Sequence, residues 1–186
     1  MSTMTVQRSF TVDEYYRMAE AGILSEDDRV ELIEGRVLTM SPIGSRHAAC
    51  VGRLDGILNR QGARRCLVWV QNPVRLDAYS EPQPDVALLR PRDDFCSEGH
   101  PGPSDVLLIV EVSESSEGYD RQVKVPLYAR AGIPEVWVVS PAERVVWVHS
   151  GPAADGYTAT RTARPGDVRA LASIPELAVP VADVVG

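Results

Sequence analysis

The chain has 186 residues, of which 44% are hydrophobic and 24% charged, the balance of an ordinary soluble globular protein. This length predicts a single domain over residues 1–186, and no apolar run reaches the roughly 18 residues that a membrane span needs. The net charge of −7 disfavours broad, non-specific nucleic-acid binding, although a local basic groove is compatible with it.

The cysteines and the N-terminal segment predict a reduced, cytoplasmic protein. Cys50, Cys66 and Cys96 are odd in number and lack CxxC spacing, which disfavours a disulfide framework or a zinc site. Residues 1–8 contain no apolar run that could act as a secretion signal. We therefore expect a cytoplasmic location.

The first predicted elements are an N-terminal helix and a β-hairpin. Thr11 and Glu14 have the spacing of a capping box, which predicts a helix that starts at Thr11 and stops at Gly22. Two short apolar runs, 30–33 and 37–40, flank a turn and predict the hairpin.

A second helix is predicted over residues 45–59, because its apolar residues recur at spacings of three and four. Strands are predicted at 67–70 and 74–76. Residues 90–105 form the longest loop of the chain and are the best candidate for a mobile flap.

Asp85 and Glu111 each stand at the end of a predicted buried strand. Asp85 precedes the apolar run 86–89, and Glu111 closes the strand 105–112, which is apolar on both faces and should be central in its sheet. If the two strands are antiparallel neighbours, both acids fall at one sheet edge. Alternation puts Glu111 on a buried face, where a charge needs a cation, a hydrogen-bond partner or a proton. The alternative is that the strand has reached solvent there.

A helix is predicted over residues 119–131. Asp120, Lys124 and Tyr128 follow one another at spacings of four and should line one face of it. Lys124 is the only lysine among 19 basic residues, whereas Pro126 predicts a kink or a new helix start. The alternative is an ordinary surface pair of Asp120 with Lys124.

The remaining elements are strands at 136–139, 145–148 and 157–162, followed by an apolar tail at 177–185. Helix, hairpin, helix, strands, helix and strands in this order predict an α/β (α+β) fold with a mixed β-sheet flanked by helices.

Asp85, Glu111 and Lys124 are the residue types of a metal-dependent phosphodiesterase site. Two carboxylates can hold Mg²⁺, with Mn²⁺ as a substitute, and such an ion lowers the pKa of a bound water. A nearby ammonium orients that water or stabilises the developing anion. His47 is a candidate phosphate contact, with a structural or solvated histidine as the alternative.

The chain resembles the Uma (Uma-two) family of restriction-endonuclease-like proteins in the PD-(D/E)XK nuclease superfamily, from Phe10 to about Leu177. The motifs that carry the resemblance are Val30-Glu31-Leu32-Ile33-Glu34-Gly35, Met40-Ser41-Pro42, His47, Pro84-Asp85-Val86-Ala87, Ile109-Val110-Glu111-Val112 and the run from Lys124 to Glu135.

The resemblance implies a restriction-endonuclease-like core with metal ligands at the edge of its sheet. Asp85 and Glu111 would be the magnesium ligands, and Glu31 an additional acid that supports them. The expected third motif is E-x-K, but Ser113 stands where its lysine would be. Lys124, on the following helix, would then replace that lysine.

We therefore expect a Mg²⁺-dependent endonuclease that hydrolyses phosphodiester bonds in nucleic acid, with DNA favoured over RNA. His47, Tyr128 and Asp120 are candidate substrate contacts, and a twofold homodimer is the expected assembly. The alternative is a non-catalytic nuclease-fold protein that binds a partner or oligomerises, which the acidic charge and the acidic loop 113–117 favour. A two-carboxylate glycosidase would leave Lys124 unexplained.

Overall fold

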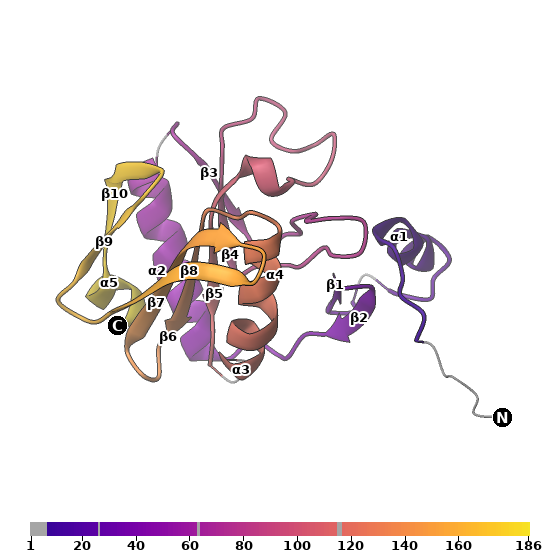
Figure 1. Cartoon of the computed structure of the whole chain (residues 1–186), viewed down its shortest axis with the longest axis horizontal. Coiled ribbons are helices and arrows are strands. Elements are labelled where there is room, and N and C mark those ends of the chain that lie inside the picture. The colour runs from indigo at the N-terminus through magenta and orange to yellow at the C-terminus, as the bar shows by residue number, and fades with distance from the viewer. Residues whose placement is uncertain (1–6, 26, 63, 115–116) are drawn as a thin grey trace.

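The strand β5 lies at the centre of a six-stranded mixed sheet in the computed structural model, which describes residues 7–25, 27–62, 64–114 and 117–186. The strand order is β3-β4-β5-β6-β7-β8 (Figure 1). Neighbours are antiparallel except for β5 and β6, which are parallel. The strands are β3 Leu67–Val70, β4 Val86–Leu89, β5 Val106–Val112, β6 Glu135–Ser140, β7 Val145–Ala153 and β8 Gly156–Ala163.

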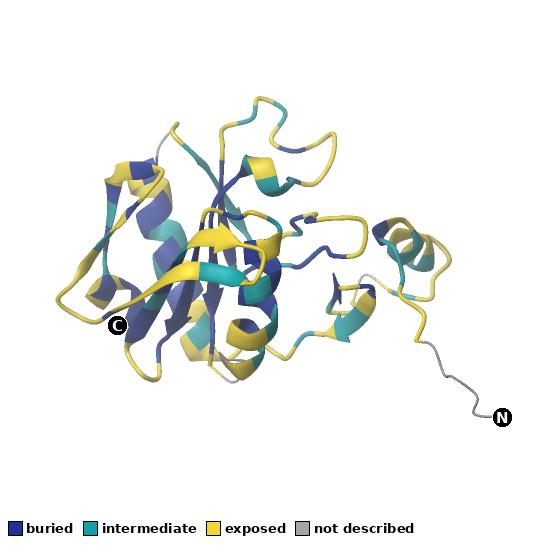
Figure 2. Ribbon diagram, viewed as in Figure 1, coloured by how far each residue is buried: buried dark blue, intermediate teal, exposed yellow. Residues whose placement is uncertain are grey.

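Helices cover both faces of this sheet, which confirms the predicted fold class. The long helix α2, Ser45–Gly62, packs on one face, and α4, Val125–Arg130, packs on the other. Alternation divides the side chains of β6 between them, so that Trp137 faces the α2 layer and Val138 the α4 layer. The strands and the inward sides of these helices form the buried interior (Figure 2).

β4 and β5 are antiparallel neighbours, which is the arrangement that places Asp85 and Glu111 at one edge of the sheet. Val86 lies opposite Val110, so Asp85 before β4 and Glu111 near the end of β5 fall at the same edge of the sheet. All seven residues of β5 are buried, which confirms its central position.

The loop 90–105 leaves the sheet at the opposite edge, because it joins the far ends of these two antiparallel strands. Arg92 pairs with Asp94 at 2.6 Å and with Asp105 at 3.5 Å, and the loop ends in the 3₁₀ turn Pro103–Asp105. The loop therefore lies away from Asp85 and Glu111, and its role as a mobile flap stays a prediction.

The N-terminal helix and hairpin lie beside the main sheet (Figure 1). Helix α1, Val12–Glu20, starts at the predicted capping box of Thr11. The hairpin pairs β1, Val30–Ile33, with β2, Arg36–Thr39. Its turn needs Gly35, which has φ +76° and whose Cβ, if present, would lie 2.4 Å from the Cβ of Ser9.

Two parts of the sequence-based prediction differ from the structure. Residues 74–76 are not a strand, because the N–H groups of Val74 and Leu76 bond to carbonyls within the following turn. The apolar tail belongs to a small C-terminal unit that was not predicted, and its helix packs against α2. The elements of this unit are β9 Val168–Leu171, β10 Ile174–Pro180 and α5 Val181–Val185.

The helix predicted over 119–131 consists of three consecutive parts. A short turn, α3 Glu117–Tyr119, leads into a π-helical segment, Asp120–Lys124, and then into α4. Val125 N–H bonds to the carbonyl of Asp120, five residues back. Pro126 lies in the first turn of α4, where its missing N–H costs nothing, so a new helix does start there.

Within the described ranges, no helix is both long and apolar enough to cross a membrane.

Candidate active site

A pocket of about 440 Å³ opens at the sheet edge where β4 begins and β5 ends. The hairpin, the start of α2, the two strands and the α3–π segment all contribute to its walls. Its charged and polar lining includes Glu31, His47, Asp85, Glu111, Asp120 and Lys124. The sequence-predicted residues therefore meet around one cavity, with the exception of Tyr128.

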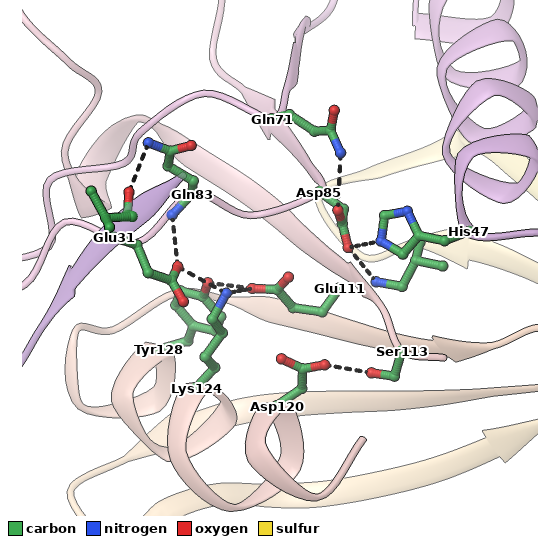
Figure 3. Close-up of polar contacts among 12 residues, drawn as sticks. Glu31, His47, Gln71, Gln83, Asp85, Glu111, Ser113, Asp120, Lys124 and Tyr128 are labelled. Atoms are coloured by element: carbon green, nitrogen blue, oxygen red, sulfur yellow. Dashed lines mark hydrogen bonds and ion pairs between the residues drawn. The ribbon is translucent and has the colours of Figure 1, made fainter. Parts of the chain in front are cut away.

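Lys124 lies between two carboxylates (Figure 3). Its Nζ is 3.0 Å from Oε2 of Glu31 and 3.4 Å from Oε1 of Glu111, and its side chain is only 8% exposed. Burial alone would lower the pKa of Lys124, but the charges of Glu111 and Glu31 outweigh it and raise that pKa above its ordinary value. Lys124 is thus a permanent buried cation, not half of a surface pair with Asp120.

Glu111 is a buried carboxylate with too little positive charge around it. Burial raises its pKa to about 8, and the charges of Asp120 and Asp85 act in the same direction. Lys124 and the hydroxyl of Tyr128 oppose this shift. The pKa of Glu111 therefore lies well above that of an exposed glutamate, and a further cation beside it would lower that pKa.

Tyr128 lies behind Glu111. Its side chain is completely buried, it does not line the pocket, and its hydroxyl donates a hydrogen bond of 2.6 Å to Oε1 of Glu111. A substrate cannot reach it, so the expected substrate contact is corrected to a residue that holds Glu111 in place.

Asp85 is held from the side of α2 and from the end of β5. Its Oδ2 lies 3.0 Å from Nε2 of His47 and accepts the N–H of Val112 at 2.8 Å. Among the described residues, its Oδ1 has only a long contact of 3.4 Å with the amide of Gln71. The hydrogen bond with Asp85 is the main cause that raises the pKa of His47. One oxygen of Asp85 is thus engaged and the other is available to a ligand.

Glu31 and Asp120 complete the acidic lining. Glu31, on β1, accepts the backbone N–H of Gln83 at 3.2 Å in addition to the ammonium of Lys124. Asp120 accepts the hydroxyl of Ser113 at 2.7 Å. Ser113, at the position where the E-x-K motif would have lysine, therefore ties the end of β5 to the helical segment that carries Lys124.

Sequence reasoning missed several residues at this pocket. Gln71 and Gln83 hold two of the acids, and the buried hydroxyl of Tyr119 has no hydrogen-bond partner among the residues that the structure describes. Gln83 stands directly before Pro84-Asp85, which was a usable signal. Neither Gln71 nor Tyr119 stands out from the pattern of the sequence.

The donor set fits a hard cation that keeps several waters. In the part of the chain that the structure describes, no three His, Cys, Asp or Glu side chains gather into a complete metal cage. Mg²⁺ needs only one or two carboxylates, with water and substrate oxygens as its other ligands. Oδ1 of Asp85 has one long contact, and burial raises the pKa of Glu111 despite Lys124, a shift that the charge of such an ion would oppose.

Two comparisons with known proteins found nuclease-like relatives. The model of the Uma2 family, described as "Putative restriction endonuclease", matches residues 12–182. Among curated proteins, none matches the chain. A crystal structure described as a putative nuclease belonging to DUF820, from Anabaena variabilis ATCC 29413, has a TM-score of 0.72 at 17% identity, and the match covers 95% of this chain and 97% of that one. At this identity the likeness shows a common fold.

Proposed function

This chain belongs to the Uma2 family of putative restriction endonucleases, and we propose that it is a Mg²⁺-dependent endonuclease that hydrolyses phosphodiester bonds in DNA. One observation carries the proposal. The only lysine of the chain lies 3.0 Å from Glu31 and 3.4 Å from Glu111, in a pocket that Asp85 also lines. Several acids and one amine around a cavity are the groups that metal-assisted phosphodiester hydrolysis needs.

The first part of the proposal assigns the metal ligands. Asp85 and Glu111 would hold Mg²⁺ or Mn²⁺, and the bound ion would lower the pKa of a water and neutralise charge on the phosphate. His47 and the N–H of Val112 orient Asp85, and Tyr128 orients Glu111. These hydrogen bonds fix the carboxylates before a ligand arrives, which lowers the reorganisation that binding requires.

The second part assigns Lys124. Its ammonium stays charged, and Glu31 holds it beside Glu111. From this position it can donate a hydrogen bond to the attacking water or to a phosphate oxygen, and so stabilise the negative charge that develops on phosphorus. Glu31 acts through Lys124 and supports the metal site from the hairpin side.

Plasmid nicking tests the assignment. Supercoiled DNA with Mg²⁺ or Mn²⁺ should be nicked by the wild-type chain, and Asp85→Asn, Glu111→Gln and Lys124→Gln should each lower the rate by about a hundredfold or more. Glu98→Gln, an exposed position in the loop at the opposite sheet edge, should leave the rate unchanged. Nicking that persists in Asp85→Asn or Lys124→Gln would rule out this site.

A non-catalytic nuclease-fold protein is the second candidate. The lack of a three-residue metal cage among the described residues favours it. Calorimetry separates the two: absence of Mg²⁺ binding at millimolar concentration, together with absence of nicking, would support partner binding or oligomerisation instead of hydrolysis.

We also propose a single cytoplasmic domain that acts as a twofold homodimer, since duplex DNA presents two strands related by a twofold axis. Sedimentation equilibrium with and without DNA tests the assembly. A monomer in both conditions would contradict it.

A further inference from the structure

Two side chains of opposite charge form an ion pair beside the pocket. Arg46, in the first turn of α2, places Nη1 3.7 Å from Oε1 of Glu114, which follows the end of β5. Their side chains are 61% and 34% exposed. Glu114 is also part of the pocket lining. The pair thus links the first turn of α2 to the segment that follows β5, and both of these elements contribute to the pocket lining.

The carboxylate of Glu114 lies close to the backbone of Gly44. A Cβ on Gly44 would stand 2.8 Å from Oε2 of Glu114, so the carboxylate is close to the backbone of Gly44 on one side and to Arg46 on the other. His47, which also lines the pocket, feels the negative charge of Glu114 in addition to that of Asp85. The carboxylate of Glu114 therefore lies beside a cation, in the lining of the same pocket as the proposed metal ligand Asp85.

Arg46 differs from the other arginine near the pocket in how firmly it is held. Arg29 lines the pocket and donates a 3.0 Å hydrogen bond to the carbonyl of Ser41. The contact of Arg46 with Glu114 is longer and exposed, and such ion pairs are weak. A guanidinium binds a phosphate through two parallel hydrogen bonds, which is stronger. A phosphate can therefore displace the carboxylate.

We propose that Arg46 binds a backbone phosphate of the DNA substrate beside the pocket, and that Glu114 competes for this place in the free protein. The inference rests on the proposed function and extends it to a substrate contact outside the metal site. In a chain of net charge −7, an internal competitor of this kind keeps affinity for DNA low.

The consequence is a gain of affinity when the competitor loses its charge. Glu114→Gln should bind duplex DNA about fivefold more tightly, the range of one exposed ion pair. Arg46→Gln should bind about fivefold more weakly and lower the slope of log affinity against log salt by about one. The double variant should behave like Arg46→Gln alone, because Glu114 acts through Arg46.

The test is fluorescence anisotropy of a labelled DNA duplex with Ca²⁺ in place of Mg²⁺, since Ca²⁺ also takes oxygen ligands. Glu98→Gln is the matched control, because it changes net charge by the same amount on an exposed loop at the opposite sheet edge. A gain of affinity in Glu114→Gln cannot arise from damage to the fold.

Four outcomes are decisive. Tighter binding by Glu114→Gln, but not by Glu98→Gln or in the Arg46→Gln background, supports the inference. The inference is overturned if the wild-type chain binds DNA and Glu114→Gln does not change the affinity. It is also overturned if Glu114→Gln raises the affinity equally in the Arg46→Gln background. Both outcomes leave the proposed function intact. Failure of both the wild-type chain and Glu114→Gln to bind DNA overturns the two together.

Discussion

Lys124 is the residue on which the electrostatics of the pocket depend. It is the one cation within 4.0 Å of both Glu31 and Glu111 among the described residues, and all three side chains are nearly buried. A buried ion pair is not by itself a strong source of stability, but removal of one partner leaves charges without compensation. Lys124 therefore couples the proposed chemistry to the fold.

Lys124→Met should lower the free energy of unfolding by about 3 kcal/mol at pH 8, because Glu31 and Glu111 lose their counter-charge. Urea denaturation in EDTA measures this. Arg130→Met is the control, since Arg130 pairs with Glu34 at 2.6 Å but on the surface, and should cost less than about 1 kcal/mol. Equal losses in the two variants would contradict the role of Lys124.

Glu111 should make the stability of the metal-free protein depend on pH. Folding raises the pKa of Glu111 from an ordinary 4.5 to about 8, so its stabilising contribution is complete below the lower value and is lost as pH rises toward the upper one. Between about pH 5 and pH 7.5, the free energy of unfolding of the wild-type chain should fall by about 1 kcal/mol per pH unit relative to that of Glu111→Gln. Urea denaturation of both variants across this range checks it, and parallel curves would contradict it.

At the scale of single residues, the sequence predicted where the acids lie better than what surrounds them. Period-two alternation placed Glu111 on a buried face, and that burial is confirmed. It could not reveal that Val112 donates to Asp85, or that Ser113 bonds Asp120, because these contacts join segments that are far apart or differently folded. The catalytic roles of Asp85 and Glu111 stay predictions.

At the scale of elements, the π-helical segment explains how a proline and a lysine can share one helical run. Bonds from residue i to i−5 widen the turn before Pro126, so Asp120 and Lys124 both project into the buried side while α4 starts afresh. Propensity alone predicted a kink or a new helix start at Pro126, and the new start is confirmed, but propensity carries no signal for a π turn.

Two glycines should respond in opposite ways to alanine. Gly35→Ala should lower the free energy of unfolding by about 2 kcal/mol, because φ is +76° and the new Cβ would clash with Ser9. Gly52→Ala, on the exposed side of α2 with open space around it, should raise it by about 0.5 to 1 kcal/mol. Thermal or urea unfolding measures both, and a stabilised Gly35→Ala would contradict the turn geometry.

At the scale of the whole molecule, the metal should stabilise the fold. Mg²⁺ at ten times its dissociation constant should raise the free energy of unfolding by about 1.4 kcal/mol, since it binds the folded chain only. Differential scanning fluorimetry would detect this as a higher Tm. Asp85→Asn and Glu111→Gln should remove the increase, whereas Glu98→Gln should keep it. The same increase in all four chains would mean that the ion binds elsewhere.

The sequence by itself determined the layered α/β fold, the central strand β5 and the edge at which Asp85 and Glu111 lie. These follow from local periodicity and from the antiparallel order of two adjacent strands, so they are readable along the chain. It also predicted a mobile flap at 90–105, which stays a prediction, and the same antiparallel argument places that loop at the far edge of the sheet.

Only the tertiary structure decided how the pocket is held together. The pairing of Lys124 with Glu31, the burial of Tyr128 behind Glu111 and the contact of Glu114 with Arg46 join residues that are 17 to 93 positions apart. Such contacts depend on how the hairpin, α2 and the π segment pack around the end of β5, and no local pattern encodes that packing. The three-dimensional arrangement therefore converts a row of acids and one lysine into a single charged cavity.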